Sequence, residues 1–166
     1  MKVAIIGHRK VKDRADTVGR IYDAVTNLIE NEGADTFLFG SGSEFDTLCY
    51  YVVSELKKIY PDISRVYVSA EWNYKDLNEL LDSYEDTYCP NKVRGANKLC
   101  YVIRNVCMIE NCDVLLTYYD DNYEPPRKRT KVPIEEHKRT KSGTQMAVEY
   151  ARKKKKRIIN VLDSPL

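Results

Sequence analysis

Ser142-Gly143-Thr144-Gln145, followed by the apolar-rich segment 146–151, is the stretch that decides the predicted fold. A small hydroxyl residue, a glycine and a threonine ahead of a helix leave backbone N–H groups free at the helix start, where the helix carries about half a positive charge. The chain then enters a strand-like segment, 157–161. This pattern predicts an anion-binding turn in an α/β fold.

Two similar turns precede it in the chain. The first is Gly7, His8 and Arg9, and the second is Gly40, Ser41, Gly42, Ser43 and Glu44, with Asp46 close behind. Glycine lets the backbone approach a ligand, and arginine can hold a phosphate through two hydrogen bonds. Asp46 is predicted either to bond ribose hydroxyls or to cap a helix together with Ser43. The second turn is neither a P-loop nor Gly-x-Gly-x-x-Gly, because no Gly-Lys-Ser/Thr follows and Phe45 takes the third glycine's place.

Strand and helix patterns alternate along the chain. Apolar spacing predicts helices over 16–31, 44–59 and 99–111, a short helix near 77–84, and strands over 2–6, 36–39, 64–68 and 114–118. Residues 119–141 form a long basic loop with three prolines and no period. This alternation of strands and helices predicts a mainly parallel sheet with helices on both faces. The three glycine turns are expected to lie together at the carboxyl edge of that sheet.

Composition is that of a soluble, single-domain protein. The chain has 166 residues, 43% of them apolar and 31% charged, and its N-terminal apolar run is too short for a signal peptide. No apolar run reaches the roughly 20 residues that span a membrane. The five cysteines form no Cys-x-x-Cys pair, so we expect reduced, buried thiols in the cytoplasm, with no metal and no cofactor.

The net charge of +2 is unevenly distributed. Basic residues gather in 127–141 and in 152–157, and such runs can mark nucleic-acid contacts. The second run is predicted to be a solvated helix end, because cations favour helix C-termini. The first run leads directly into Ser142 and is the more interesting for function.

A third constellation joins Arg104, Met108 and Asp113, with Met108 expected in the core and Asp113 in a turn. Together these segments resemble the SLOG superfamily of Rossmann-like nucleotide-binding domains. The Arg104–Met108 spacing is similar to the Arg-x-x-x-Met helix of the Lonely Guy phosphoribohydrolases. The turns at 40–46 and 142–147 look like those of DNA-processing protein A. The resemblance spans most of the chain except 71–98 and 119–141.

The resemblance implies nucleotide binding, but the chain departs from the enzymes. Lonely Guy enzymes carry glutamates two and three residues after the threonine of their Gly-Thr turn, and here Met146 and Ala147 stand there. Glu149 comes five residues after Thr144, and moving from the third to the fifth position rotates a helical side chain by roughly 200°. The expected catalytic carboxylate is therefore missing.

Three functions follow as expectations. The first is non-catalytic binding of a nucleotide-type small molecule, such as an ADP-ribose-type or cyclic nucleotide signal, by a sensor or sequestering protein of antiphage defence or counter-defence. The second is N-glycoside hydrolysis, with Arg104, Glu44 and Asp46 as candidate catalytic residues and Glu71 as a further acid. The third is single-stranded nucleic-acid binding. The resemblance also implies a homo-oligomer, and four aromatic residues are candidate base-stacking platforms: Tyr74, Tyr118, Tyr119 and Tyr123.

Overall fold

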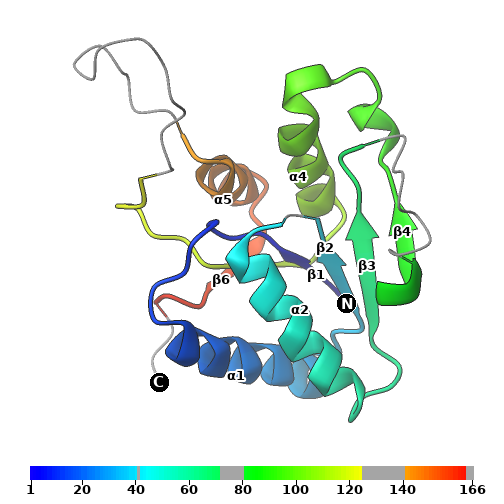
Figure 1. The fold of residues 1–166 in the computed structure, drawn as a ribbon, viewed down its shortest axis with the longest axis vertical. Helices are drawn as coiled ribbons and strands as arrows, with labels where there is room; N and C mark the ends of the chain where they lie inside the picture. Colours follow the sequence, from blue (N-terminus) through cyan, green and yellow to red (C-terminus); the bar gives the residue numbers. More distant parts are fainter. Residues whose placement is uncertain (41, 72–80, 125–140, 164–166) are drawn as a thin grey trace.

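The computed structural model describes residues 1–40, 42–71, 81–124 and 141–163 (Figure 1). The elements in chain order are β1 (Lys2–Ile5), α1 (Arg14–Glu32), β2 (Thr36–Phe39), α2 (Glu44–Lys57), β3 (Ser64–Val68), β4 (Asp86–Tyr88), the 3-10 turns η1 (Asn91–Val93) and η2 (Asn97–Leu99), α4 (Cys100–Glu110), β5 (Val114–Thr117), α5 (Gly143–Lys153) and β6 (Arg157–Asn160). Strands and helices alternate as the sequence predicts.

The described strands form one parallel sheet in the order β4-β3-β2-β1-β5-β6. Strand β1 lies in the middle, with Val3 opposite Phe37 of β2 on one side and Val114 of β5 on the other. The direction of strand addition reverses between β1 and β5. Loops leave the sheet in opposite directions at such a point, where ligands bind in open α/β sheets. The predicted α/β, Rossmann-like architecture is confirmed.

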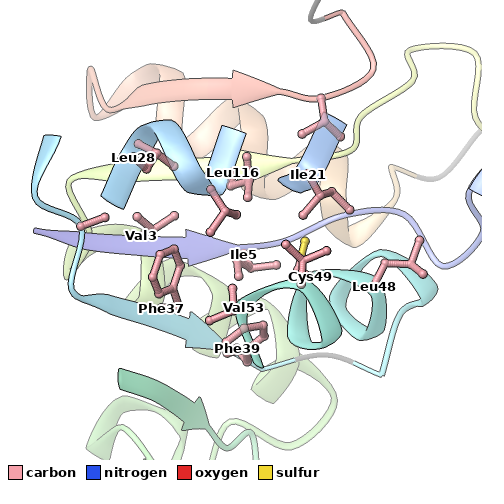
Figure 2. Packing of buried hydrophobic residues seen from close by; sticks show 14 of the residues in the cluster. Val3, Ile5, Ile21, Leu28, Phe37, Phe39, Leu48, Cys49, Val53 and Leu116 are labelled. Carbon is pink, nitrogen blue, oxygen red and sulfur yellow. The ribbon is translucent and has the colours of Figure 1, made fainter. Parts of the chain in front are cut away.

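Helices cover both faces of the sheet, α1 and α2 on one side and α4 and α5 on the other (Figure 1). Val3, Ile5 and Phe37 point toward α1 and α2 (Figure 2). Their neighbours Ala4 and Leu38 pack toward α4 and α5. Because the central strands are buried on both faces, they appear in the sequence as continuous apolar runs.

Side-chain caps set where three helices begin. Asp13, Ser43 and Ser142 each accept a hydrogen bond from the backbone N–H three residues on, before α1, α2 and α5. Gly33, at φ 69°, ends α1 in the left-handed conformation that glycine adopts without strain. The strand ends and helix starts that surround the candidate site are therefore fixed by local sequence.

Several sequence-based boundaries and faces need correction. Helix α1 begins at Arg14, two residues before the predicted start, because Asp13 supplies the cap. Strand β4 was not predicted. Of the short helix expected near 77–84, residues 81–83 are helical, and 77–80 lie outside the described residues. The apolar spacing of the helix over 99–111 predicts that Val102, Val106 and Ile109 point inward. Ile109 is buried, but Val102 and Val106 are only partly buried.

Four residues form the buried face of α4: Arg104, Cys107, Met108 and Ile109. The core position expected for Met108 is confirmed. No helix among residues 1–40, 42–71, 81–124 and 141–163 has the length and apolar character needed to cross a bilayer.

Candidate anion-binding site

The loops that follow β1, β2, β3 and β5 leave the same edge of the sheet, as parallel strands require. Helix α2 begins at this edge, so its first turn lies beside the loops (Figure 1). Arg104 reaches the same edge from α4, on the other face. The candidate site is built where these segments meet.

Arg104 is the central residue, and its side chain is 2% exposed. Its Nη1 donates to the carbonyl oxygen of Val68 at the end of β3 (3.2 Å), and its Nε donates to Asn105 Oδ1 (2.9 Å). Among the described residues, no carboxylate forms an ion pair with this guanidinium. Burial lowers the pKa of Arg104, and the charge of Asp46 acts in the opposite direction. An arginine stays protonated even so, which leaves a buried cation at the edge of the sheet.

Gly40 makes room for this cation. A Cβ atom at position 40 would lie 2.4 Å from Arg104 Nη1, closer than such atoms ever approach. The glycine at the end of β2 therefore lets the guanidinium lie directly against the backbone. Two motifs that are far apart in the sequence are brought together here.

Asp46 adds a negative charge to the same cluster. It is 3% exposed in the first turn of α2, where its backbone N–H donates to Ser43 Oγ (3.0 Å). Its charge raises the pKa of Arg104 and also contributes to the raised pKa of buried Cys49 and Tyr84. The predicted N-cap at Ser43 is confirmed, and the ribose contact of Asp46 stays a prediction.

Tyr101 lies one helical turn before Arg104 on α4. The Arg104 Cζ atom lies 5.9 Å from the centre of the Tyr101 ring. The Tyr101 hydroxyl donates to Glu71 Oε1 (3.3 Å), in the loop after β3. Sequence reasoning did not single out Tyr101, although its three-residue spacing from Arg104 places both on neighbouring positions of one helix.

His8 belongs to a second cluster, between β1 and β5. The ring is 1% exposed, and its Nε2 lies 3.0 Å from the backbone nitrogen of Asp120 and 3.2 Å from the Asp120 carbonyl oxygen. Tyr123 stacks on it, with ring centroids 3.9 Å apart. Burial lowers the pKa of His8, and its buried Nδ1 has no hydrogen-bond partner in the described part of the chain.

The tyrosines near His8 are core residues. Tyr118 and Tyr119 are 3% and 8% exposed. The Tyr118 hydroxyl accepts from the Lys12 N–H, and the Tyr119 hydroxyl donates to Asp121. Buried rings do not offer an open face to a base, so these two platforms are not supported. Tyr123 already stacks on His8, and Tyr74 lies outside the described residues.

Gly7 and Arg9, the other two residues of the first glycine turn, contact the start of α2. A Cβ atom on Gly7 would lie 2.2 Å from the Phe45 ring, so this glycine serves close packing. Arg9 is exposed, and its carbonyl accepts from the Glu44 N–H (3.2 Å). The Glu44 carboxylate accepts from the Val11 N–H (3.1 Å). Glu44 therefore positions the loop, and its catalytic role stays a prediction.

The turn before α5 has a side-chain cap that was not predicted. Ser142 Oγ accepts from the Gln145 N–H (3.0 Å), Gly143 is exposed, and Thr144 is buried. The Gln145 side chain donates to Glu149. Gly42 is exposed before α2, and Ser41 lies outside the described residues. The ligand contacts assigned to these residues stay predictions.

The predicted site residues thus fall into groups. Arg104, Gly40 and Asp46 form one cluster, which we call the Arg104 cluster. His8 lies in another with Tyr123 and Asp120. Within the described residues, no three His, Cys, Asp or Glu side chains are grouped so as to hold a metal ion.

Comparison with known proteins gives no family assignment. No protein-family model matches the chain, and no curated protein matches its sequence.

Proposed function

We propose that this protein binds a nucleotide or nucleotide-derived signal, of the ADP-ribose or cyclic-nucleotide type, without cleaving it. In this proposal it is a SLOG-like sensor or sequestering protein. One observation carries the proposal: the Arg104 guanidinium is 2% exposed at the carboxyl edge of the sheet and has no ion pair among the described residues.

Burying a charge costs free energy unless the charge is paired. A buried cation without a full ionic partner destabilises the folded protein, so its presence is explained best by a ligand. Arginine presents a planar fork that matches two phosphate oxygens. The first turn of α2, at Glu44–Asp46, lies beside it and contributes the positive end of the helix dipole. A phosphate group would supply the missing negative charge.

Asp46 narrows the class of ligand. A buried carboxylate beside Arg104 would repel a bare phosphate and would accept hydrogen bonds from sugar hydroxyls. This pairing favours a phosphorylated ribose over inorganic phosphate. Both interactions belong to a nucleotide.

Binding without cleavage is supported by the turn before α5. Met146 and Ala147 occupy the positions where the resembling enzymes carry glutamates. Glu149 is exposed, and its carboxylate accepts from Lys141 Nζ (2.7 Å). Its charge is therefore engaged at the surface of α5.

N-glycoside hydrolysis is the second candidate, and Asp46 is the observation that favours it. A carboxylate next to the phosphate-binding arginine could stabilise the oxocarbenium-like sugar of such a reaction, as in glycosidases. The same experiment separates the two functions.

The test is native mass spectrometry with mono-, di- and cyclic nucleotides, ADP-ribose and ribose 5-phosphate, followed by calorimetry. We expect one nucleotide to be retained unchanged and to raise the melting temperature by mass action. Release of free base would favour the hydrolase. No adduct and no heat with any compound would overturn the proposal.

Arg104→Met is the decisive variant, because it keeps an unbranched side chain that can fill part of the buried space and removes the charge. We expect its affinity for the retained nucleotide to fall at least tenfold. Arg152→Met, which removes an exposed arginine from the last turn of α5, is the matched control and should bind normally. Circular dichroism establishes that both variants are folded.

A further inference from the structure

Tyr101 has an accessible ring beside the buried cation. It is 56% exposed on the first turn of α4, whereas Arg104, three residues on, is 2% exposed. The helix thus presents an aromatic surface to solvent and a guanidinium to the interior, one turn apart. The distance of 5.9 Å from Arg104 Cζ to the ring centroid shows that the two groups are neighbours.

The loop after β3 positions both groups. The Val68 carbonyl accepts from Arg104, and three residues later Glu71 accepts from the Tyr101 hydroxyl. A turn fixes Glu71, because its N–H donates to Ser69 Oγ (3.0 Å) and Ser69 Oγ donates to its carbonyl (2.9 Å). One short segment of backbone therefore sets the relative placement of the cation and the ring.

We propose that Tyr101 is the platform on which the base of the ligand stacks while Arg104 holds its phosphate. This inference rests on the proposed function. It adds recognition of the base, which is the part of the ligand that the Arg104 cluster does not recognise. The class of ligand is a nucleotide with an intact base, selected over sugar phosphates. Stacking on a tyrosine tolerates different bases, because every base has a π face.

The bond to Glu71 gives the platform its orientation. Tyrosine loses little conformational freedom on binding, and a hydroxyl tether reduces that loss further. Glu71 is thus a positioning residue for the ring. Tyr101→Phe keeps the ring and removes the tether, so we expect a smaller loss of affinity than in Tyr101→Ala.

The experiment compares two probes by calorimetry: the nucleotide that binds best in the panel, and ribose 5-phosphate, which has no base. For the wild-type protein we expect the nucleotide to bind more tightly. Tyr101→Ala should weaken nucleotide binding about 5- to 150-fold, the range expected for one base stacked on an aromatic ring. Its affinity for ribose 5-phosphate should be unchanged.

Tyr22→Ala is the matched control. Tyr22 is 43% exposed on α1, which covers the opposite face of the sheet from α4. Tyr22→Ala should leave the affinities for the nucleotide and for ribose 5-phosphate unchanged. A loss of affinity in this control would reveal a general effect of losing a surface tyrosine.

The outcomes separate the two proposals. If nucleotide binding survives Tyr101→Ala, or ribose 5-phosphate binds the wild-type protein as tightly as the nucleotide, the platform is overturned and the proposed function stands. If neither probe binds the wild-type protein, both proposals are overturned. Equal losses for both probes in Tyr101→Ala would also overturn the platform, since they would mean damage to the Arg104 cluster.

Discussion

At the scale of single residues, Arg104 and His8 are two buried basic groups at the carboxyl edge. Arg104 is held as a cation against the Val68 carbonyl, and one ring nitrogen of His8 has no hydrogen-bond partner among the described residues. The first has the chemistry of a ligand site. The second makes a contribution to stability that depends on pH.

The pH dependence of His8 can be predicted with its sign. Burial lowers the pKa of His8 in the folded protein below the value of about 6.5 found in unfolded chains. The unfolded state therefore takes up the proton more readily, and the free energy of unfolding falls as the pH drops below about 6.5. Nearby, Asp120, which is ion-paired with Lys12, partly offsets the effect, because its backbone and its negative charge favour the charged histidine.

Urea unfolding at pH 7.5 and at pH 5.5 measures this effect. His8→Gln should reduce the loss of stability between the two pH values. The other histidine, His137, lies outside the described residues, and His137→Gln serves as the control with an unchanged loss. An equal pH effect in wild type and His8→Gln would contradict the prediction.

Residue roles could be predicted only where the local sequence determines them. The cap at Ser43 was one of the two roles predicted for the start of α2, and it is confirmed. The cap at Ser142 was not predicted, although a small polar residue before an apolar run is the same signal. The requirement for glycine at positions 7 and 40 has a different cause: Phe45 and Arg104 occupy the space of the missing side chain. Such contacts depend on the packing of separate elements, which a single sequence does not specify.

At the scale of elements, α5 depends on the residue that precedes it, Ser142, for its start. Ser142 Oγ accepts from the Gln145 N–H and replaces a hydrogen bond that the first turn lacks. Ser142→Ala should lower the free energy of unfolding by about 1 kcal/mol, as typical N-cap losses do. Ser142→Asp keeps an acceptor and should cost much less. Urea denaturation of the two variants measures the difference, and equal losses would count against the cap.

Helix α4 and strand β4 show where pattern reading failed. The buried face of α4 includes the charged residue Arg104. Because the sequence pattern assigns buried positions to apolar residues, it predicts Val102 and Val106 on the inward face instead. Strand β4 is only three residues long at the edge of the sheet, with Asp86 and Tyr88 exposed. It carries no apolar alternation, so its pairing with β3 is a tertiary effect.

At the scale of the whole molecule, burial divides the five cysteines into two classes. Cys49, Cys107 and Cys112 are buried, whereas Cys89 and Cys100 are partly exposed, so the expectation that all five thiols are buried is wrong for these two. Burial raises the pKa of the three buried thiols and of Cys89. All are free thiols. Since the thiolate is the reactive form, exposed thiols react first.

Thiol labelling followed by intact-mass measurement tests this packing. The native protein should acquire two adducts rapidly, at Cys89 and Cys100, and all five only in denaturant. Peptide mapping identifies the labelled positions. Rapid labelling of Cys49 in the native protein would contradict the core, because Cys49 lies fully buried between α2 and the sheet (Figure 2).

The central place of β1 has a consequence for synthesis on the ribosome. One side of β1 pairs with β2, which follows soon in the chain, but the other side waits for β5, which begins only at Val114. At about 5–20 residues per second the ribosome takes on the order of ten seconds to make the intervening chain. Throughout that time one edge of the apolar strand β1 is unpaired in the nascent chain. Chaperones bind such surfaces, and strands of other chains can pair with them incorrectly.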